Sequence, residues 1–566
     1  MDLQALFKQF VDTGVDLVWN TPSVFPWFVA MLLGAGIFVT IRLGFPNIRL
    51  FKHAIDCIRG KFDDPEDKGD INHFQALTTA LSATVGIGNI AGVALGIHYG
   101  GPGIVFWLWV SGFFGMTLKF TEVTLAHNYR TFDAEGNVSG GPMYTMERGL
   151  GGHWKILAGA FAVLAVFCSF GTGNMNQANT VAVSAASDFG LSGWVVGLIL
   201  AGTAGLVIIG GIKRIGAVSS RLMPTMAVLY TIGALIILLG EPSKLPHLFA
   251  TIFREAFTPS AAFGGTAVGA FSFTLLWGVK RALFSNEAGQ GSAPIAHAAA
   301  RTHEPVREGV VALLEPFVDT LMICTLTGLV IVTTGVWKEK FPQVRPLELN
   351  KIQVKAAPKR PVTDRDLHGE HPVELADYEG TFRVREGKPE GLRFILNDAF
   401  VDEPRLLQGG KPYTGELTLR NGTLTTKEGK GITLALSGKM LLSSSALTAR
   451  AFHEGFEETL GLGWLGNLVV SVSVFLFGLS TIISWAYYGD RCVEYLFGVK
   501  YTRIYHIAYT CFTYLGAVLA LETVWNYGDL AMGLMATTNL ISVLALTPVA
   551  VRLTKEYFSK VHKVYK

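Results

Sequence analysis

Long apolar runs are the feature of this sequence that most limits its fold. A helix needs about 20 apolar residues to cross the bilayer core. The 566-residue chain is 50% hydrophobic and 16% charged, whereas soluble domains carry about 25% charged residues. We therefore expect an all-α polytopic membrane protein with eleven spans, at roughly 25–43, 73–98, 102–127, 155–184, 192–211, 217–239, 263–299, 308–336, 463–488, 503–523 and 527–551.

Lys and Arg residues are distributed unevenly between the expected connections. Alternate connections contain 22 of them, whereas the opposite connections, apart from a long insert, contain only Lys8, Lys244 and Arg254. Cytoplasmic loops carry the excess of basic residues in membrane proteins. The pattern predicts a multi-pass protein in contact with membrane lipid, with its N-terminus outside the cell membrane and its C-terminus in the cytoplasm. In a Gram-negative bacterium this would be the inner membrane.

Residues 338–450 interrupt the membrane pattern. They contain 19 Lys and Arg residues. The runs 415–420 and 423–425 flank Asn421-Gly422, which is typical of a β-hairpin turn. We expect a first transmembrane part at 1–337, a small extracytoplasmic β-rich domain at 338–450, and a last transmembrane part at 451–566. The insert is either a decorated loop or a lid or docking module for an external partner.

Two expected spans contain glycine-rich interruptions. The first lies at Gly86-Ile87-Gly88-Asn89. The second lies in the stretch 277–291, with the break expected at Gly278-Val279, within 263–299, a segment too long for one ordinary span. A glycine costs about 1 kcal/mol inside a helix, and the backbone groups that a break frees cannot be satisfied by lipid. A glycine pair can serve close helix packing, or it can mark a broken helix that lines a cavity.

The spacing of the two interruptions favours broken helices. Leaving out the first span, the interruptions fall in the first and sixth of the remaining ten spans. Corresponding breaks in two halves are typical of an inverted-repeat transporter. Freed carbonyls can hold a cation, and the N-terminal end of a half-helix can hold a carboxylate. An amino acid and a sodium ion together need both kinds of group.

Several motifs along the chain together resemble one family. They lie at 84–93, 100–103 with 106–109, 115–116 with 119–120, 140–144, 173–179, 284–289 and 487–492. They include Thr84-Val85-Gly86-Ile87-Gly88-Asn89 and Phe284-Ser285-Asn286-Glu287-Ala288-Gly289. The sequence resembles the alanine/glycine:cation symporters, also called sodium:alanine symporters, over essentially the whole chain except 338–450.

This resemblance implies a LeuT-type fold, in which one extra N-terminal helix precedes a five-plus-five inverted repeat. It also implies uptake of alanine or glycine with sodium as the coupling ion, and no organic cofactor. By motif position, the substrate contacts would come from Thr84, Gly88, Gln177, Trp277, Gly278 and Val279. The sodium site would use the carbonyls of Ser82 and Val85 and the hydroxyls of Ser480 and Thr481, with Asn89 holding a second ion or the substrate.

The second interruption departs from the family pattern. The family shows Ala-Arg-Gly after the Gly-Val pair, whereas this chain has Lys280-Arg281-Ala282. A lysine there could alter substrate size, add affinity for an acidic group, or substitute for a cation. We consider Lys280, Arg281 and Glu287 as gate residues. Glu287, Glu315 and Asp319 cluster near the expected inner gate, where an acid could form a salt bridge with Arg281 or Arg301. Ordinary interfacial charges that extend toward the lipid surface are the alternative.

Other function classes are less well supported by the sequence. The net charge of +3 and the lack of a basic patch with interleaved aromatics give no indication of nucleic-acid binding. The sequence has no P-loop, no metalloprotease spacing and no other catalytic set, so we do not expect an enzyme. Two alternatives stay open: a proton-coupled carrier of another small amino acid, and a transporter-like receptor or sensor with 338–450 as its input.

Overall fold

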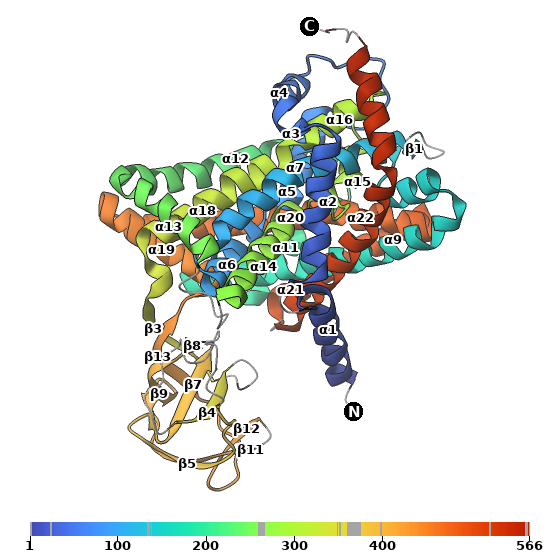
Figure 1. Ribbon diagram of the computed structural model, residues 1–566. Coiled ribbons are helices and arrows are strands. Elements are labelled where there is room, and N and C mark those ends of the chain that lie inside the picture. Colours follow the sequence, from blue (N-terminus) through green and yellow to red (C-terminus); the bar gives the residue numbers. More distant parts are fainter. Residues whose placement is uncertain are drawn as a thin grey trace.

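A helical bundle makes up most of the molecule, and a β-rich domain projects from one of its ends (Figure 1). The computed structural model describes residues 3–22, 25–132, 136, 138–258, 267–347, 349, 352–358, 375–396, 399–420, 422–519, 522–560 and 564. Helix α1 and the β-rich domain extend from the same end of the bundle, and the last turns of α22 protrude from the opposite end.

The helices of the first half are α1 (Leu3–Trp19), α2 (Trp27–Arg42), α3 (Pro46–Arg49), α4 (Phe51–Ile58), α5 (His73–Thr84), α6 (Val93–Gly100), α7 (Ile104–Asn128), α8 (Pro142–Tyr144), α9 (Lys155–Phe170), α10 (Asn176–Phe189), α11 (Gly193–Ile208), α12 (Gly211–Gly240) and α13 (Leu245–Phe257). They continue with α14 (Ala267–Asn286), α15 (Ala293–His297), α16 (Pro305–Ala312), α17 (Leu314–Pro316), α18 (Thr325–Thr334), α19 (Ser444–Leu460), α20 (Gly463–Phe497), α21 (Thr502–Val518) and α22 (Glu522–Ser559).

Membrane-spanning length is reached by six helical segments of the described chain, and by a seventh if the bent pair α5–α6 counts as one span. These seven coincide with expected spans at 73–98, 102–127, 155–184, 217–239, 308–336, 463–488 and 527–551. The shorter apolar helices α2 and α11 lie where two more were expected. A polytopic membrane protein is therefore confirmed, and the count of eleven stays a prediction.

π-helical stretches occur inside several of these segments, where each loosens the regular helical ladder. Two of them adjoin the functional region described below, at Gly88–Gly92 and Phe317–Cys324. The broken helix α5–α6 lies in the interior, since ten of the twelve residues of α5 are buried. Its start is fixed by a capping box, in which Asn72 and Gln75 exchange side-chain to backbone hydrogen bonds.

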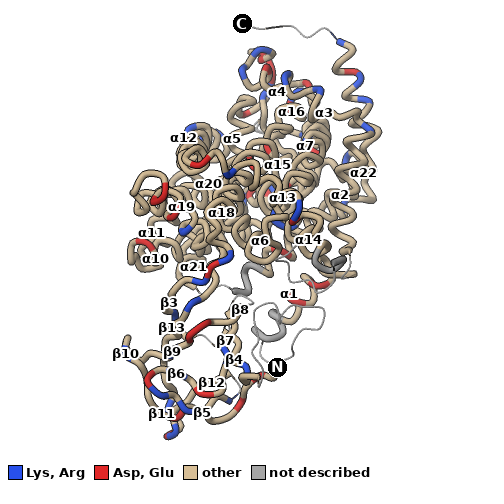
Figure 2. The backbone as a smooth tube through the Cα atoms, turned by 60° about the vertical axis from the view of Figure 1, so that its left-hand side comes forward, with Lys and Arg blue, Asp and Glu red and all other residues tan. Residues whose placement is uncertain are grey.

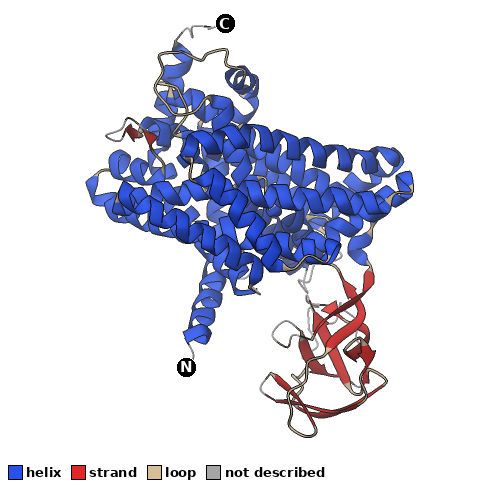
Figure 3. Ribbon diagram, turned by 180° about the vertical axis from the view of Figure 1, so that it is seen from behind, coloured by secondary structure: helices blue, strands red, loops and turns tan. Residues whose placement is uncertain are grey.

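The projecting domain contains most of the strands (Figure 3). The strands of the chain are β1 (Thr131–Phe132), β2 (Val138–Ser139), β3 (Lys340–Pro346), β4 (Gln353–Ala356), β5 (Gly380–Arg385), β6 (Lys388–Pro389), β7 (Leu392–Leu396), β8 (Ala399–Phe400), β9 (Asp402–Gln408), β10 (Lys411–Pro412), β11 (Gly415–Arg420), β12 (Thr423–Thr426) and β13 (Ala435–Leu441). The domain's three antiparallel sheets have the orders β10-β9-β13-β3, β12-β11-β5-β6 and β4-β7-β8.

The expected hairpin is present, because β11 pairs antiparallel with β12 and Arg420 lies opposite Thr423. Asn421, which was expected in its turn, lies outside the described residues. The alternation of burial along β5, with Phe382 and Val384 inward, gives the domain its own apolar core. Helix α19 begins at Ser444, inside the range expected for the insert.

The domain is attached to the bundle through two neighbouring strands. β3 follows α18 and β13 precedes α19, and the two strands pair over seven residues from Lys340 opposite Leu441 to Pro346 opposite Ala435. Charged residues are frequent in this domain and at the end of the bundle where α4 and the last turns of α22 lie (Figure 2).

Candidate functional site at the interrupted helix

The expected interruption at Gly86-Ile87-Gly88-Asn89 is present. Helix α5 ends at Thr84, and its axis is bent by 48° from that of the helix that resumes at Gly88. Side chains replace the missing helical partners: the Gly86 N–H donates to Asn89 Oδ1 at 2.9 Å. The Ile87 N–H donates to Gln177 Oε1 at 3.2 Å. The break is therefore held open by two buried amides rather than by lipid or water.

Four of the five residues expected to hold sodium lie around the last turn of α5 and the facing turn of α20. Ser480 Oγ and Thr481 Oγ1 donate to the Ser82 carbonyl over 3.2 Å and 3.3 Å. Val85, the first residue after α5, is fully buried. The hydroxyl of Ser82 is buried and has no hydrogen-bond partner among the described residues. Oxygen ligands suit a hard cation, so these residues fit a sodium ion.

The expected substrate residues Thr84, Gly88 and Gln177 also adjoin the break. Thr84 Oγ1 makes only long hydrogen bonds of 3.3 Å to the carbonyls of Ala80 and Leu81. A Cβ on Gly88 would lie 2.8 Å from the ring of Phe284. The ring of Phe284 therefore limits the space beside the break. Phe284 lies in one of the sequence motifs, but the sequence analysis predicted no role for it.

The second interruption was expected in 277–291 and is present there, but it does not lie at Gly278-Val279, where we expected the break itself. Helix α14 runs without a break from Ala267 to Asn286. A Cβ on Gly278 would lie 2.4 Å from Trp107 Cβ and 3.1 Å from the Ile104 carbonyl. Gly278 is therefore a packing glycine that lets α7 approach α14 closely.

The helix is instead interrupted directly after Asn286. Glu287, Gly289 and Gly291 have φ values of 55°, 82° and 87°. A left-handed conformation is uncommon for a residue other than glycine, so Glu287 is held there by its surroundings. Trp485 Nε1 donates to its carboxylate at 2.9 Å, and the hydroxyl of Ser292 donates to the other carboxylate oxygen.

Trp277 and Lys280 make their contacts with other elements, and Val279 is fully buried. Trp277 stacks on Tyr99 near the end of α6, with ring centroids 4.5 Å apart. Lys280 Nζ lies 2.6 Å from Asp529 Oδ2, and Arg281 Nη2 lies 3.5 Å from the same oxygen. The salt bridge expected between Arg281 and Glu287 is therefore not formed, because both Lys280 and Arg281 pair with Asp529 of α22.

Asp319 is the polar residue at this site whose position the sequence did not predict. It is fully buried in the π-helical stretch Phe317–Cys324. Asn89 Nδ2 donates to its Oδ1 at 2.6 Å, and Ser285 Oγ donates to its Oδ2 at 2.7 Å. We had grouped it with Glu287 as a gate charge. Its contacts instead connect the first break to α14.

Comparison with known proteins agrees with this geometry. A sequence profile of the sodium:alanine symporter family matches residues 4–355 and 429–566. The chain belongs to the sodium:alanine symporter family. The resemblance seen in the motifs is thereby confirmed, and the segment between the two matched ranges lies within the β-rich domain.

Relatives of this chain have names that refer to alanine or to glutamine. The sodium/alanine symporter AgcS of Methanococcus maripaludis is 37% identical over 556 residues, which cover 97% of each chain. The putative sodium/proton-dependent alanine carrier protein YrbD of Bacillus subtilis is 30% identical over 552 residues, 97% of this chain and 92% of the relative. The probable sodium/glutamine symporter GlnT of the same organism is 29% identical over 557 residues, 98% and 93% of the two chains.

Proposed function

We propose that this chain is a sodium-coupled symporter that carries small neutral amino acids, alanine and glycine, into the cell by alternating access. Family membership supports cation-coupled transport of amino acids. The observation that carries the finer proposal is the first break, where buried amide, hydroxyl and carbonyl groups converge around Gly86.

Sodium is proposed to bind between α5 and α20. Its ligands are the carbonyls of Ser82 and Val85 and the hydroxyls of Ser480 and Thr481. Both hydroxyls already point at the Ser82 carbonyl over long hydrogen bonds, of 3.2 Å and 3.3 Å. A sodium ion between these oxygens would replace the two long hydrogen bonds with coordination bonds, and no helix would have to move.

The substrate is proposed to bind on the other side of the same break, with its backbone held by Thr84, Gly88 and Gln177. We assign to Phe284 the substrate contact that the family resemblance implied for Trp277, because the ring of Phe284 lies against Gly88. A ring this close leaves room for a small side chain. Asn89 is proposed to couple the break to Asp319 rather than to contact the substrate.

A LeuT-type inverted repeat is the fold that we propose for the bundle. Its support is the pair of interruptions, the first between α5 and the helix at Gly88 and the second between α14 and α15. The proposed orientation has the β-rich domain outside and the C-terminus in the cytoplasm. These two features lie at opposite ends of the bundle (Figure 1).

Purified symporter in liposomes would test the function. We expect labelled alanine and glycine to accumulate when sodium is imposed on one side, with a peak that a sodium ionophore abolishes. Liposomes without protein are the control. Accumulation that a proton gradient alone drives equally well would instead support the proton-coupled carrier. Saturable binding without accumulation under any gradient would support the receptor.

Competition by unlabelled amino acids would test the size of the pocket in the same preparation. We expect alanine and glycine to compete strongly, and leucine and phenylalanine to compete weakly. Equal competition by large amino acids would contradict the role given to Phe284.

A further inference from the structure

A chain of alternating acidic and basic side chains runs through the interior at the end of the bundle opposite the β-rich domain. His297 Nε2 lies 2.7 Å from Glu315 Oε1, and Lys119 Nζ lies 3.2 Å from Glu315 Oε2. On the other side, Glu308 Oε1 contacts His297 Nδ1 and Glu308 Oε2 contacts His73 Nδ1. The order of contact is thus His73, Glu308, His297, Glu315 and Lys119.

These five residues come from separate elements and are excluded from solvent. His73 starts α5, Lys119 lies in α7, His297 ends α15, Glu308 lies in α16 and Glu315 in α17. His73 is 2% exposed and the other four are 0% exposed. Burying a charge costs several kcal/mol unless it is paired, so each of them depends on its neighbours in the chain.

His297 requires an additional proton in this arrangement. A neutral imidazole has one N–H and one bare nitrogen. Both of its nitrogens face carboxylates, those of Glu308 and Glu315. A bare nitrogen opposite a carboxylate oxygen would be repulsive. Either the imidazole is doubly protonated or one of the carboxyls carries a proton, and in both cases the three groups share one proton more than a neutral imidazole supplies.

The local charge balance leads to the same requirement. Lys119 pairs with Glu315 at 3.2 Å and lies 4.0 Å from Glu122 Oε1. The Lys119 ammonium and the Arg130 guanidinium, which interacts with Glu308, are two positive charges and cannot balance the three carboxylates of Glu122, Glu308 and Glu315. Protons on the two imidazoles or on the carboxyls must supply the difference, and histidine is the side chain that gains and loses a proton near neutral pH.

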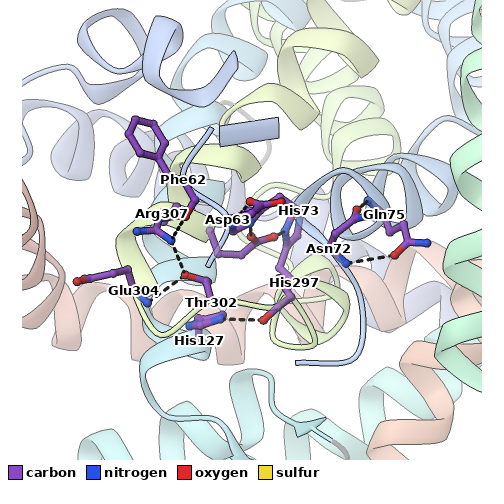
Figure 4. Close-up of polar contacts among 12 residues, drawn as sticks. Phe62, Asp63, Asn72, His73, Gln75, His127, His297, Thr302, Glu304 and Arg307 are labelled. Atoms are coloured by element: carbon purple, nitrogen blue, oxygen red, sulfur yellow. Dashed lines mark hydrogen bonds and ion pairs between the residues drawn. The ribbon is translucent and has the colours of Figure 1, made fainter. Parts of the chain in front are cut away.

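One end of the chain reaches the surface. Asp63, whose side chain is 43% exposed, places Oδ1 3.6 Å from His73 Nε2. Figure 4 shows Asp63, His73 and His297 close together, beside Arg307 and Thr302. Asp63 Oδ1 is buried and has no hydrogen-bond partner among the described residues, and a small rotation of this partly exposed side chain would close the gap. The buried groups can therefore exchange protons with the solution at this face.

The other end reaches the second interruption. The Gly289 N–H donates to Glu122 Oε1 at 3.4 Å. Asn539 Nδ2 donates both to Glu122 Oε2 at 2.8 Å and to the Gly289 carbonyl at 3.0 Å. Because Gly289 lies in the break between α14 and α15, Glu122, which lies 4.0 Å from Lys119, connects this chain to the interrupted segment.

Further ionisable groups surround the chain and must be considered in its protonation. His127 of α7 and Arg130 in the following loop interact electrostatically with Glu308. Glu287 interacts in the same way with Lys119. Tyr488 of α20 faces Glu122, Glu287 and Glu315. Burial lowers the pKa of Arg130 to about 10, so its guanidinium stays protonated near neutral pH. It donates to the carbonyls of Ala298 and Ala300, both at 2.7 Å.

We propose that Glu308, His297 and Glu315 form a proton-binding site that is separate from the sodium site. This site exchanges protons with the cytoplasmic face through His73 and Asp63. Its protonation controls the α14–α15 interruption. A proton taken from solvent by Asp63 passes to His73 Nε2, and the proton on His73 Nδ1 passes to Glu308. The proton on Glu308 Oε2 reaches His297 Nδ1 after rotation of the Glu308 carboxyl, and the imidazolium so formed shares its Nε2 proton with Glu315. Each transfer breaks one O–H or N–H bond and forms another, and the net result is one proton moved from solvent to the buried site.

The first test measures proton binding on the purified full chain in detergent, so it does not depend on transport. The unbuffered protein is titrated between pH 6 and 8.5 with a soluble pH indicator. We expect Glu308→Gln to bind about one proton fewer than the unmodified protein, because it removes the central carboxylate of the site. Glu304→Gln, four residues earlier and paired with Lys560 at the surface, is the matched control. Equal proton uptake by Glu308→Gln and Glu304→Gln would overturn the proposal.

The second test rests on the proposed transport function. Sodium-driven alanine uptake is measured in oriented liposomes while the pH at the C-terminal face is changed from 6 to 8.5. We expect the rate to fall about fivefold as the site loses its proton, and this dependence to be lost in Glu308→Gln. Asp63→Asn, a change at an exposed side chain that preserves the core, should slow the response to a pH jump. A rate independent of pH at that face, or an unchanged profile in both variants, would overturn the proposal.

Discussion

Single buried residues decide the geometry of the first break. Asn89 and Gln177 replace helical carbonyls as acceptors for the Gly86 and Ile87 amides. Gly86 must lack a side chain, because a Cβ there would lie 2.5 Å from Thr481 Oγ1 and 3.2 Å from Gln177 Oε1. The residue scale is therefore where sodium and substrate affinity should be most sensitive to change.

Gly86→Ala should weaken sodium activation of transport. The added methyl group would push the Thr481 hydroxyl away from the proposed ion, and the loss of one good ligand costs about 1–3 kcal/mol. We expect the sodium concentration for half-maximal uptake to rise about tenfold. Gly92→Ala is the control, because its nearest contacts would be at an ordinary 3.8 Å. Equal sodium dependence in both variants would remove Thr481 from the ion site.

Thr84→Ala and Gln177→Ala should weaken substrate binding, and Gln177→Ala should also lower stability because it leaves the buried Ile87 N–H without its acceptor. The matched control is Thr78→Ala, which lies on the same helix, is 1% exposed and also bonds back to its own helix. We expect the alanine concentration for half-maximal uptake to rise about tenfold in the two test variants, since each loses one hydrogen-bonding group. Unchanged kinetics relative to Thr78→Ala would exclude these residues from the site.

At the scale of elements, the sequence predicted what local chemistry determines. Hydropathy located the long apolar helices, two glycines with an asparagine located the break after α5, and alternation located the β11–β12 hairpin. The second break was placed at Gly278, whereas the structure places it at Glu287–Ser292. Both stretches are glycine-containing and lie in one apolar segment, so no local rule separates them.

The difference between the two stretches is tertiary. Gly278 is needed because Trp107 of α7 packs against it. Gly289 and Gly291 are needed because the chain there adopts positive φ. In the same way, the partner of Asp319 is Asn89, 230 positions away, and no spacing in the sequence indicates that contact.

Gly278→Ala should therefore act on stability rather than on the substrate site. Its methyl group would meet Trp107 Cβ at 2.4 Å, and overpacking of this kind costs about 1–3 kcal/mol. We expect a lower melting temperature in detergent, with affinity for alanine unchanged in the protein that remains folded. Gly159→Ala on α9, which would meet no atom within 4 Å, should not lower it. A large change in alanine affinity at normal stability would restore Gly278 to the binding site.

At the scale of the whole molecule, the bundle and the β-rich domain are separable. The domain has its own apolar core, centred on residues such as Val384, Phe394 and Leu417. It joins the bundle only where β3 and β13 leave it side by side, within the part of the chain that the structure describes. Paired antiparallel residues lie about 5 Å apart, so the bundle does not need the domain in order to close its chain.

Replacement of 342–439 by a short Gly-Ser turn that joins Phe341 to Met440 should preserve sodium-driven uptake. Those two residues already lie opposite one another, and a turn of a few residues closes an antiparallel pair. We expect uptake rates within about twofold of the full chain, with the full chain as the control. Loss of uptake in a protein that still melts cooperatively would show that the domain acts as a lid.

The orientation can be measured by labelling. With the exposed Cys511 replaced by Ser, Glu428→Cys in the β-rich domain should react with a membrane-impermeant maleimide on intact cells. Lys555→Cys near the end of α22 should react only after permeabilisation, since the β-rich domain and the last turns of α22 lie at opposite ends of the molecule. The other cysteines, Cys57, Cys168, Cys324 and Cys492, are buried. Labelling of Lys555→Cys on intact cells would reverse the proposed topology.

The paired stem of β3 and β13 also has a practical consequence for imaging. A membrane protein of 61.2 kDa whose mass lies almost entirely within a micelle gives projection images that are difficult to align. Here a folded domain on a two-stranded stem projects from one side and has no counterpart on the other. It would serve as a built-in fiducial for electron cryomicroscopy and as an epitope for antibody fragments at a distance from the moving helices.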